Sequence, residues 1–185
     1  MQKLRNGVMK LEIITKYSNR RGLVLSGYFK PFPLLFGGHE PSPMEMAINV
    51  KKVKYNSDYK MIKKLYSYAF PDIERLPLVL LRLMSLKSNI EFYSVYDDAD
   101  FCGLLYLVNN KGKTLIYYFA VRSDIRSMGY GTKILEWLKK EKNSISLIME
   151  TVREECDNDV QRQQRKDFYL KNGFKDTGYY MKDYS

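Results

Sequence analysis

Arg126-Ser127-Met128-Gly129-Tyr130-Gly131 lies between a run typical of a buried strand and a run typical of an amphipathic helix. The preceding residues, 114–121, are β-branched and aromatic, which favours a strand. The following residues, 132–140, place four apolar side chains on one helical face, namely Ile134, Leu135, Trp137 and Leu138. A helix that begins here leaves its first backbone amides unpaired, and glycine lets an anion approach them closely. The stretch predicts a phosphate-binding turn or an ordinary strand-to-helix turn.

The spacing of these glycines excludes the two commonest phosphate loops. The sequence has no G-x-x-x-x-G-K-[ST], so a P-loop nucleotide triphosphatase is not expected. It also lacks a G-x-G-x-x-G after a first strand with an acidic residue about 20 positions later, which excludes a dinucleotide-binding fold. The remaining pattern is Arg-x-x-Gly-x-Gly, with the arginine just before the helix.

A second block follows the loop: Arg165-Lys166-Asp167-Phe168-Tyr169-Leu170-Lys171-Asn172-Gly173-Phe174. The first block resembles the acyl-CoA pyrophosphate loop of the GNAT superfamily of N-acetyltransferases. The second resembles the superfamily's F-Y-x-x-x-G-F ending of the fourth helix. The two blocks also occur in the family's order and at a fitting separation, and together they place the resemblance over residues 46–182.

The resemblance implies an α/β (α+β) fold. Its mixed, mostly antiparallel sheet would have about six strands and about four helices, splayed between the fourth and fifth strands. The residue pattern agrees, with strands expected at 46–54, 91–96, 101–108, 114–121, 144–151 and 174–182. Helices are expected at 59–69, capped by Asp58, and at 78–86, 132–140 and 159–171.

Residues 46–185 are expected to form the acetyltransferase-like domain, and residues 1–45 an N-terminal extension. The extension contains four of the six prolines and reads as a hairpin followed by irregular linker, or as a non-native leader with little fixed structure. The family's seventh and last strand is missing after the sixth. Three explanations remain open: a truncated chain, a strand from a partner, or the N-terminal hairpin covering the gap.

The resemblance also implies a cofactor site for acetyl-CoA as cosubstrate, without a metal. The backbone around Phe119, Ala120 and Val121 would bind the pantetheine amides in the splay. The diphosphate would lie on the loop, where backbone amides matter more than side chains and Arg126 adds charge. The loop residues in question are Arg126, Ser127, Met128, Gly129, Tyr130, Gly131 and Thr132.

Catalysis by direct attack of an amine on the thioester needs a base, an oxyanion donor and a proton for the thiolate. Tyr169 occupies the position that this family uses to protonate the thiolate. The family often has a glutamate on the fourth strand, but this sequence has Tyr117 and Tyr118 there. Glu150 and Glu74 are the alternative candidates for the base, and each also fits a surface ion pair.

Composition limits the other functions. The net charge is +10, but cations and acids alternate along the sequence, so a nucleic-acid-binding stripe is not expected. No apolar run reaches the ~20 residues of a membrane span. Two distant cysteines and one histidine suit a cytoplasmic protein and provide no zinc motif.

The sequence therefore predicts a cytoplasmic, CoA-dependent N-acetyltransferase that acts on an amine of a small molecule or peptide, with a homodimer left open. Its short C-terminal end predicts that activity is impaired. The alternative is a non-catalytic acyl-CoA-binding or protein-interaction module on the same fold, because the base is unidentified. A basic nucleic-acid-binding protein ranks last.

Overall fold

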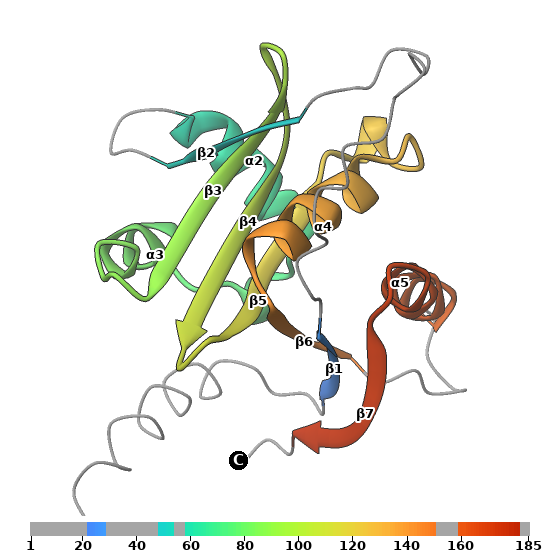
Figure 1. Cartoon of the computed structure of the whole chain (residues 1–185). Coiled ribbons are helices and arrows are strands. Elements are labelled where there is room, and N and C mark those ends of the chain that lie inside the picture. Colours follow the sequence, from blue (N-terminus) through green and yellow to red (C-terminus); the bar gives the residue numbers. More distant parts are fainter. Residues whose placement is uncertain (1–21, 29–47, 54–57, 151–158, 182–185) are drawn as a thin grey trace, which may run out of the picture.

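The computed structural model describes residues 22–28, 48–53, 58–150 and 159–181. Its centre is a mixed, seven-stranded sheet with the order β2-β3-β4-β5-β6-β1-β7 (Figure 1). The strands are β1 (Gly22–Tyr28), β2 (Ile48–Lys52), β3 (Ile90–Asp97), β4 (Asp100–Asn110), β5 (Lys113–Val121), β6 (Ser144–Glu150) and β7 (Lys175–Met181). Among the described strands, β5 and β6 are the one pair that is parallel, and the other neighbours are antiparallel. The predicted fold class is therefore confirmed.

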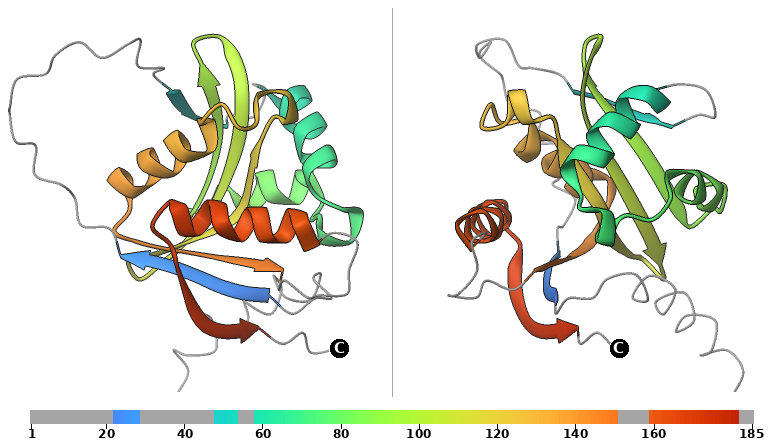
Figure 2. Two further views of the ribbon diagram at one scale, coloured as in Figure 1. Left: turned by 90° about the vertical axis from the view of Figure 1, so that its right-hand side faces the viewer. Right: turned by 180° about the vertical axis from the view of Figure 1, so that it is seen from behind.

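The helices of the described ranges cover the two faces of the sheet (Figure 2). They are α2 (Tyr59–Ala69), α3 (Leu78–Met84), α4 (Tyr130–Glu141) and α5 (Asp159–Lys171), and the short 3-10 helices are η1 (Asp72–Glu74) and η2 (Ser123–Ile125). One apolar core lies under α4 and α5, and a second lies under α2 and α3. We call these two sides the α4/α5 face and the α2/α3 face.

Strand β1 lies between β6 and β7, where the family's last strand would be expected. All seven residues of β1 pair with β6, from Gly22 opposite Glu150 to Tyr28 opposite Ser144. Leu25 is fully buried (0% exposed) and joins the core of the α4/α5 face. Of the three explanations for the missing strand, this arrangement matches the one in which the N-terminal segment fills the gap. The other half of the expected hairpin, residues 10–17, lies outside the described residues.

The start of α2 and the end of α3 differ in detail from the sequence prediction. Helix α2 begins after Asp58 as expected, but that side chain makes no capping hydrogen bond. Asp58 has φ 62°, and its Oδ2 instead accepts a hydrogen bond of 2.8 Å from Ser94 Oγ on β3. Helix α3 ends at Met84 rather than Leu86, because the amides of Leu86 and Lys87 bond three residues back, as in a tighter turn.

Leu25→Ala should show how far the fold depends on β1. Removing a fully buried leucine side chain should lower the free energy of unfolding by about 2–5 kcal/mol. Val24→Ala is the matched control, because Val24 is only partly buried in the same strand, and its loss should be about 1 kcal/mol. Urea denaturation measures both values. Equal stabilities of the two variants would contradict the placement of Leu25 in the core.

Candidate functional site

Strands β5 and β6 stay together for only a short distance. Their parallel pairing covers Thr114–Ile116 opposite Ile145–Leu147 and then ends. Beyond this point β5 continues to Val121 on its ladder with β4, and β6 continues on its ladder with β1. Figure 1 shows the two strands diverging toward the start of α4. We use the word cleft for this separation of the two backbones, which corresponds to the predicted splay.

A β-bulge in β5 lies where the cleft begins. The register of β4 against β5 shifts between Tyr106 and Leu107, so that Tyr117 is an extra residue on β5. A bulge of this kind changes the face to which the following side chains point. Past it, Phe119 and Val121 pack against the core of the α4/α5 face. The bulge therefore sets which side chains of β5 face the predicted cofactor.

The backbone of β5 past the bulge offers hydrogen-bonding groups to the cleft. The Arg122 amide donates to the Cys102 carbonyl on β4 at 2.9 Å, and the Ala120 carbonyl also faces β4. In an antiparallel ladder, successive residues point their backbone groups alternately to opposite sides. The groups of Phe119 and Val121 consequently point toward the cleft. Of the three residues predicted to bind the pantetheine chain, these two are aligned for it, and Ala120 is directed toward β4.

The predicted phosphate loop leads directly into α4. Ser127 and Gly129 have φ values of 65° and 90°, so the backbone is left-handed at both positions. The Lys133 amide donates a hydrogen bond of 3.1 Å to the Gly129 carbonyl, as expected at the start of a helix. The amides before it lie at the positive end of the helix dipole, where anions bind favourably. These are the amides of Tyr130, Gly131 and Thr132.

The side chains before α4 are exposed at this end of the molecule. Arg126, Ser127 and Met128 are all exposed, and Met128 is 55% accessible. Arg126 can therefore reach an anion at the loop without first leaving a buried partner. That Ser127 and Met128 act through the backbone shape of the loop rather than through their side chains stays a prediction from the sequence.

Tyr130 differs from that expectation, because its side chain has a structural role. The ring is buried (7% exposed), and the hydroxyl donates a hydrogen bond of 2.5 Å to Asp97 Oδ2 at the end of β3. This hydrogen bond, together with burial, raises the pKa of Tyr130 to about 12. The contact fixes the first residue of α4 to the β3–β4 turn. No local pattern in the sequence indicates it, since the partners are far apart in the chain.

Helix α5 supports the loop from the other side. A Cβ atom placed on Gly131 would lie 2.9 Å from Phe168 Cζ, so the absent side chain allows close packing of α4 on α5. Asn172 is buried, and its Nδ2 donates to the Phe168 carbonyl at 2.8 Å and, at a longer 3.4 Å, to Thr132 Oγ1. The second sequence block thus contacts the first directly. Asn172 belongs to the second sequence block, but the spacing of residues does not reveal its contact with Thr132.

Tyr169 lies in the core of the α4/α5 face, on α5. It is 8% exposed, and its ring packs against Phe168 and Phe174 with centroids 5.2 and 5.6 Å away. Burial raises the pKa of Tyr169 to about 12. Among the described residues, no hydrogen-bond partner of its hydroxyl is found. Its hydroxyl therefore stays protonated at neutral pH and is suited to donate a hydrogen bond.

The two candidate bases lie in different parts of the structure. Glu74 belongs to η1, on the α2/α3 face, and its carbonyl accepts a hydrogen bond of 2.8 Å from the Tyr118 hydroxyl. Glu150 ends β6 opposite Gly22, but its side chain lies outside the described part of the structure. Tyr169 belongs to the core of the α4/α5 face, whereas the Glu74 backbone contacts Tyr118, which belongs to the core of the α2/α3 face.

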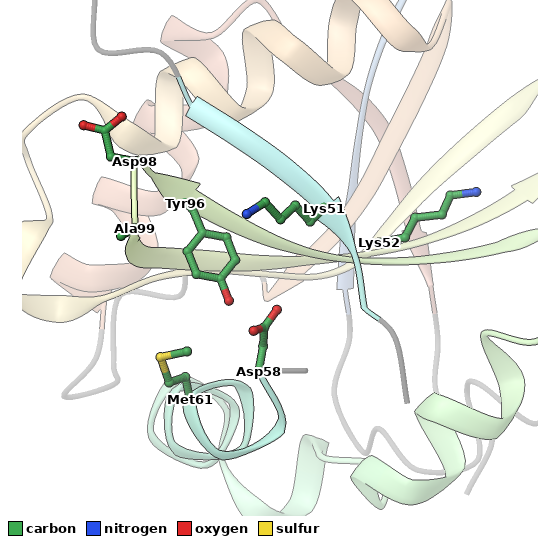
Figure 3. A pocket seen from close by; sticks show the side chains of 7 residues that line it. All are labelled: Lys51, Lys52, Asp58, Met61, Tyr96, Asp98 and Ala99. Atoms are coloured by element: carbon green, nitrogen blue, oxygen red, sulfur yellow. The ribbon is translucent and has the colours of Figure 1, made fainter. Parts of the chain in front are cut away.

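A separate cavity of about 630 Å³ lies away from the cleft, beside β2 and the start of α2 (Figure 3). Lys51 Nζ lies 4.9 Å from the ring centroid of Tyr96, and Asp58 lies beneath that ring. Burial and the neighbouring Asp58 carboxylate raise the pKa of Tyr96 to about 12. The cavity is open and shares no lining residue with the predicted cofactor site, so it does not bear on that site.

The described residues contain no cluster of three or more His, Cys, Asp or Glu that could hold a metal ion. None of the helices in the described ranges is long and apolar enough to cross a membrane.

Comparison with known proteins identifies the domain. Residues 88–176, which contain both sequence blocks, match the model of the acetyltransferase (GNAT) domain. No curated protein matches the chain in sequence. This segment is therefore a GNAT acetyltransferase domain, as the two motifs indicated.

Solved structures show the same fold. A Bacteroides thetaiotaomicron protein assigned to the GNAT family superposes with a TM-score of 0.56 at 21% identity, over 66% of this chain and 69% of that one. A GCN5-related N-acetyltransferase from Sphaerobacter thermophilus gives 0.53 at 14% identity, over 92% and 53%. An aminoglycoside acetyltransferase from an uncultured soil metagenomic sample gives 0.50 at 17%, over 68% and 90%. Identities this low indicate a shared fold and leave the acceptor open.

Proposed function

We propose that this protein is an N-acyltransferase that moves an acetyl group from acetyl-CoA to an amine. The observation that carries the proposal is the cleft between β5 and β6, which opens next to the amide-lined loop before α4. An extended ligand could place its amides between β5 and β6 and its diphosphate on the loop before α4. The GNAT domain supports acetyl transfer in general.

The cofactor would bind mainly through backbone groups. The pantetheine amides would pair with Phe119 and Val121, as an added strand pairs with a sheet edge. The diphosphate would accept hydrogen bonds from the first amides of α4, and Arg126 would add a positive charge. Tyr130 and Gly131 would contribute indirectly, because their contacts with Asp97 and Phe168 keep the loop in place.

The reaction would proceed by direct attack. The amine nitrogen forms a bond to the acetyl carbon, the carbon–sulfur bond breaks, and the amine loses one proton while the thiolate gains one. We assign Tyr169 to the thiolate. A free thiol has a pKa of about 8.5, and Tyr169 has a pKa of about 12. The buried tyrosine therefore stabilises the thiolate by donating a hydrogen bond more readily than by releasing its proton.

Glu74 and Glu150 remain the proposed acceptors of the amine proton. Glu74 is supported by its place on the α2/α3 face, because it lies across the sheet from Tyr169. A base and a thiolate donor on opposite sides of the cleft can act on the two ends of the same tetrahedral intermediate. Glu150 is supported only by its position at the end of β6.

The alternative function is an acyl-CoA-binding module without turnover. It is favoured by the two tyrosines at positions 117 and 118, where the family often has a glutamate, and by the engagement of the Tyr118 hydroxyl with backbone groups. Such a module would bind acetyl-CoA as tightly as an enzyme does but would not consume it.

Acetyl-CoA binding and consumption separate these functions. We expect isothermal calorimetry to show binding, and free CoA release to show turnover with at least one amine. The screen should include a polyamine, an aminoglycoside, a lysine-containing peptide and a peptide with a free N-terminus. Binding without turnover of any amine would favour the module. A folded protein that does not bind acetyl-CoA would contradict both proposals.

Gly129→Ala should weaken acetyl-CoA binding. Gly129 has φ 90°, where an L-residue is strained by about 1–2 kcal/mol, so the loop should move out of its anion-binding shape. Gly112→Ala in the β4–β5 turn is the matched control, since Gly112 has φ 76° and likewise nothing within 4 Å of an added Cβ. Both variants should lose similar stability. Only Gly129→Ala should raise Kd, and equal Kd values would contradict the assignment of the loop.

Tyr169→Phe should lower kcat by about 100-fold with little change in Kd for acetyl-CoA, because the thiolate loses its donor. In the wild type, ionisation of the Tyr169 hydroxyl should lower kcat only when the pH approaches about 12. Tyr93→Phe is the control: Tyr93 lies in the same core, and burial raises its pKa to about 12 as well. An unchanged kcat in Tyr169→Phe would remove this residue from the mechanism.

A further inference from the structure

Two tyrosine hydroxyls hold the loop that connects η1 to α3. The Tyr118 hydroxyl donates to the Glu74 carbonyl at 2.8 Å and accepts from the Leu76 amide at 3.2 Å. The Tyr66 hydroxyl donates to the Leu76 carbonyl at 3.0 Å. Both backbone groups of Leu76, which is 1% exposed, are therefore satisfied by side chains rather than by secondary structure. We call residues 74–76 the clamped loop.

The clamped loop is attached to β5 at the point where the cleft opens. Tyr118 directly follows the bulged Tyr117 and lies two residues past Ile116, the last residue of β5 that pairs with β6. Its ring is fixed by aromatic neighbours, with centroids 5.0 Å from Tyr66 and 4.8 Å from Phe70. A ring held in this way places its hydroxyl with little freedom.

The hydrogen bonds of the Tyr118 hydroxyl suit it to position the clamped loop rather than to transfer a proton. Its single proton is directed to the Glu74 carbonyl, and its oxygen already accepts from Leu76. Loss of the proton would break the first of these contacts. Tyr118 thus differs in role from the glutamate that the family resemblance places on this strand.

We propose that Tyr118 is a positioning residue that holds the clamped loop at the acceptor side of the cleft, where the loop orients Glu74 and shapes the approach of the amine. The inference rests on the proposed function. If the diphosphate lies at α4 and Tyr169 faces the thiolate from the α4/α5 face, the α2/α3 face is the side left for the amine. The clamped loop covers β5 on that face, and Tyr118 is the side chain that ties it there.

Tyr118→Phe tests the role, with Tyr106→Phe as the matched control. Tyr106 is also buried on this face, and its hydroxyl donates to the Leu81 carbonyl at 3.1 Å, on α3 rather than on the loop. Both variants remove one buried tyrosine hydroxyl, so a general loss of stability should be similar in both. Hydrogen exchange of residues 72–77, and KM for acetyl-CoA and for the best amine of the screen, are then measured on each protein.

Tyr118→Phe should speed exchange at the Leu76 amide by about tenfold or more, because that amide loses its acceptor. KM for the amine should rise by about tenfold, while KM for acetyl-CoA stays unchanged, and Tyr106→Phe should show neither effect. Unchanged protection of Leu76, or equal rises in KM in both variants, would overturn the proposal. If the wild type acetylates no amine, the proposed function and the acceptor role fall together, whereas the exchange data still decide whether Tyr118 clamps the loop.

Discussion

The short parallel pairing of β5 with β6 is the constraint on which the rest of the site depends. Thr114–Ile116 join two antiparallel parts of the sheet, one centred on β4 and the other on β1. Each part continues its own ladder after the junction, so the strands separate without losing their outer partners. The backbone groups of Phe119 and Val121 are left directed away from β4, beyond the last pair of β5 with β6. An extended ligand with amides can pair with them.

Strand β1 stabilises β6 and β7 where β6 separates from β5. Without a strand on its other side, β6 would have only its three pairs with β5, and β7 would have no neighbour within the described sheet. The ladder from Gly22 to Tyr28 gives β6 a full-length partner, and Leu25 adds a buried apolar contact. The same sheet position can be filled from either end of a chain, because antiparallel pairing depends on register and side-chain pattern rather than on sequence order.

The sequence predicted the elements with strong local patterns and missed those set by distant contacts. Helix α4 followed from its apolar periodicity, strand β5 followed from its β-branched and aromatic composition, and the glycine spacing predicted the loop between them; in the structure Gly129 of this loop is left-handed. The place of β1 was only one of three open explanations for the missing strand, since its partners lie more than a hundred residues away. The bulge at Tyr117 was equally hidden, because a one-residue shift in register leaves the local composition unchanged. Without knowledge of the bulge, one cannot deduce that Tyr118 faces the α2/α3 core while Phe119 faces the α4/α5 core.

The two sequence motifs belong together for a physical reason. Gly131 leaves room for the Phe168 ring, and Asn172 spans from the end of α5 toward Thr132 at the start of α4. The same turn of α5 that carries Phe168 also carries Tyr169, whose hydroxyl we assign to the thiolate. A change in how α5 packs on α4 would therefore change the distance between the predicted diphosphate loop and the proposed thiolate donor. In the proposed complex, this distance depends on one helix–helix contact, and for this reason either motif alone is a weaker signal than the pair.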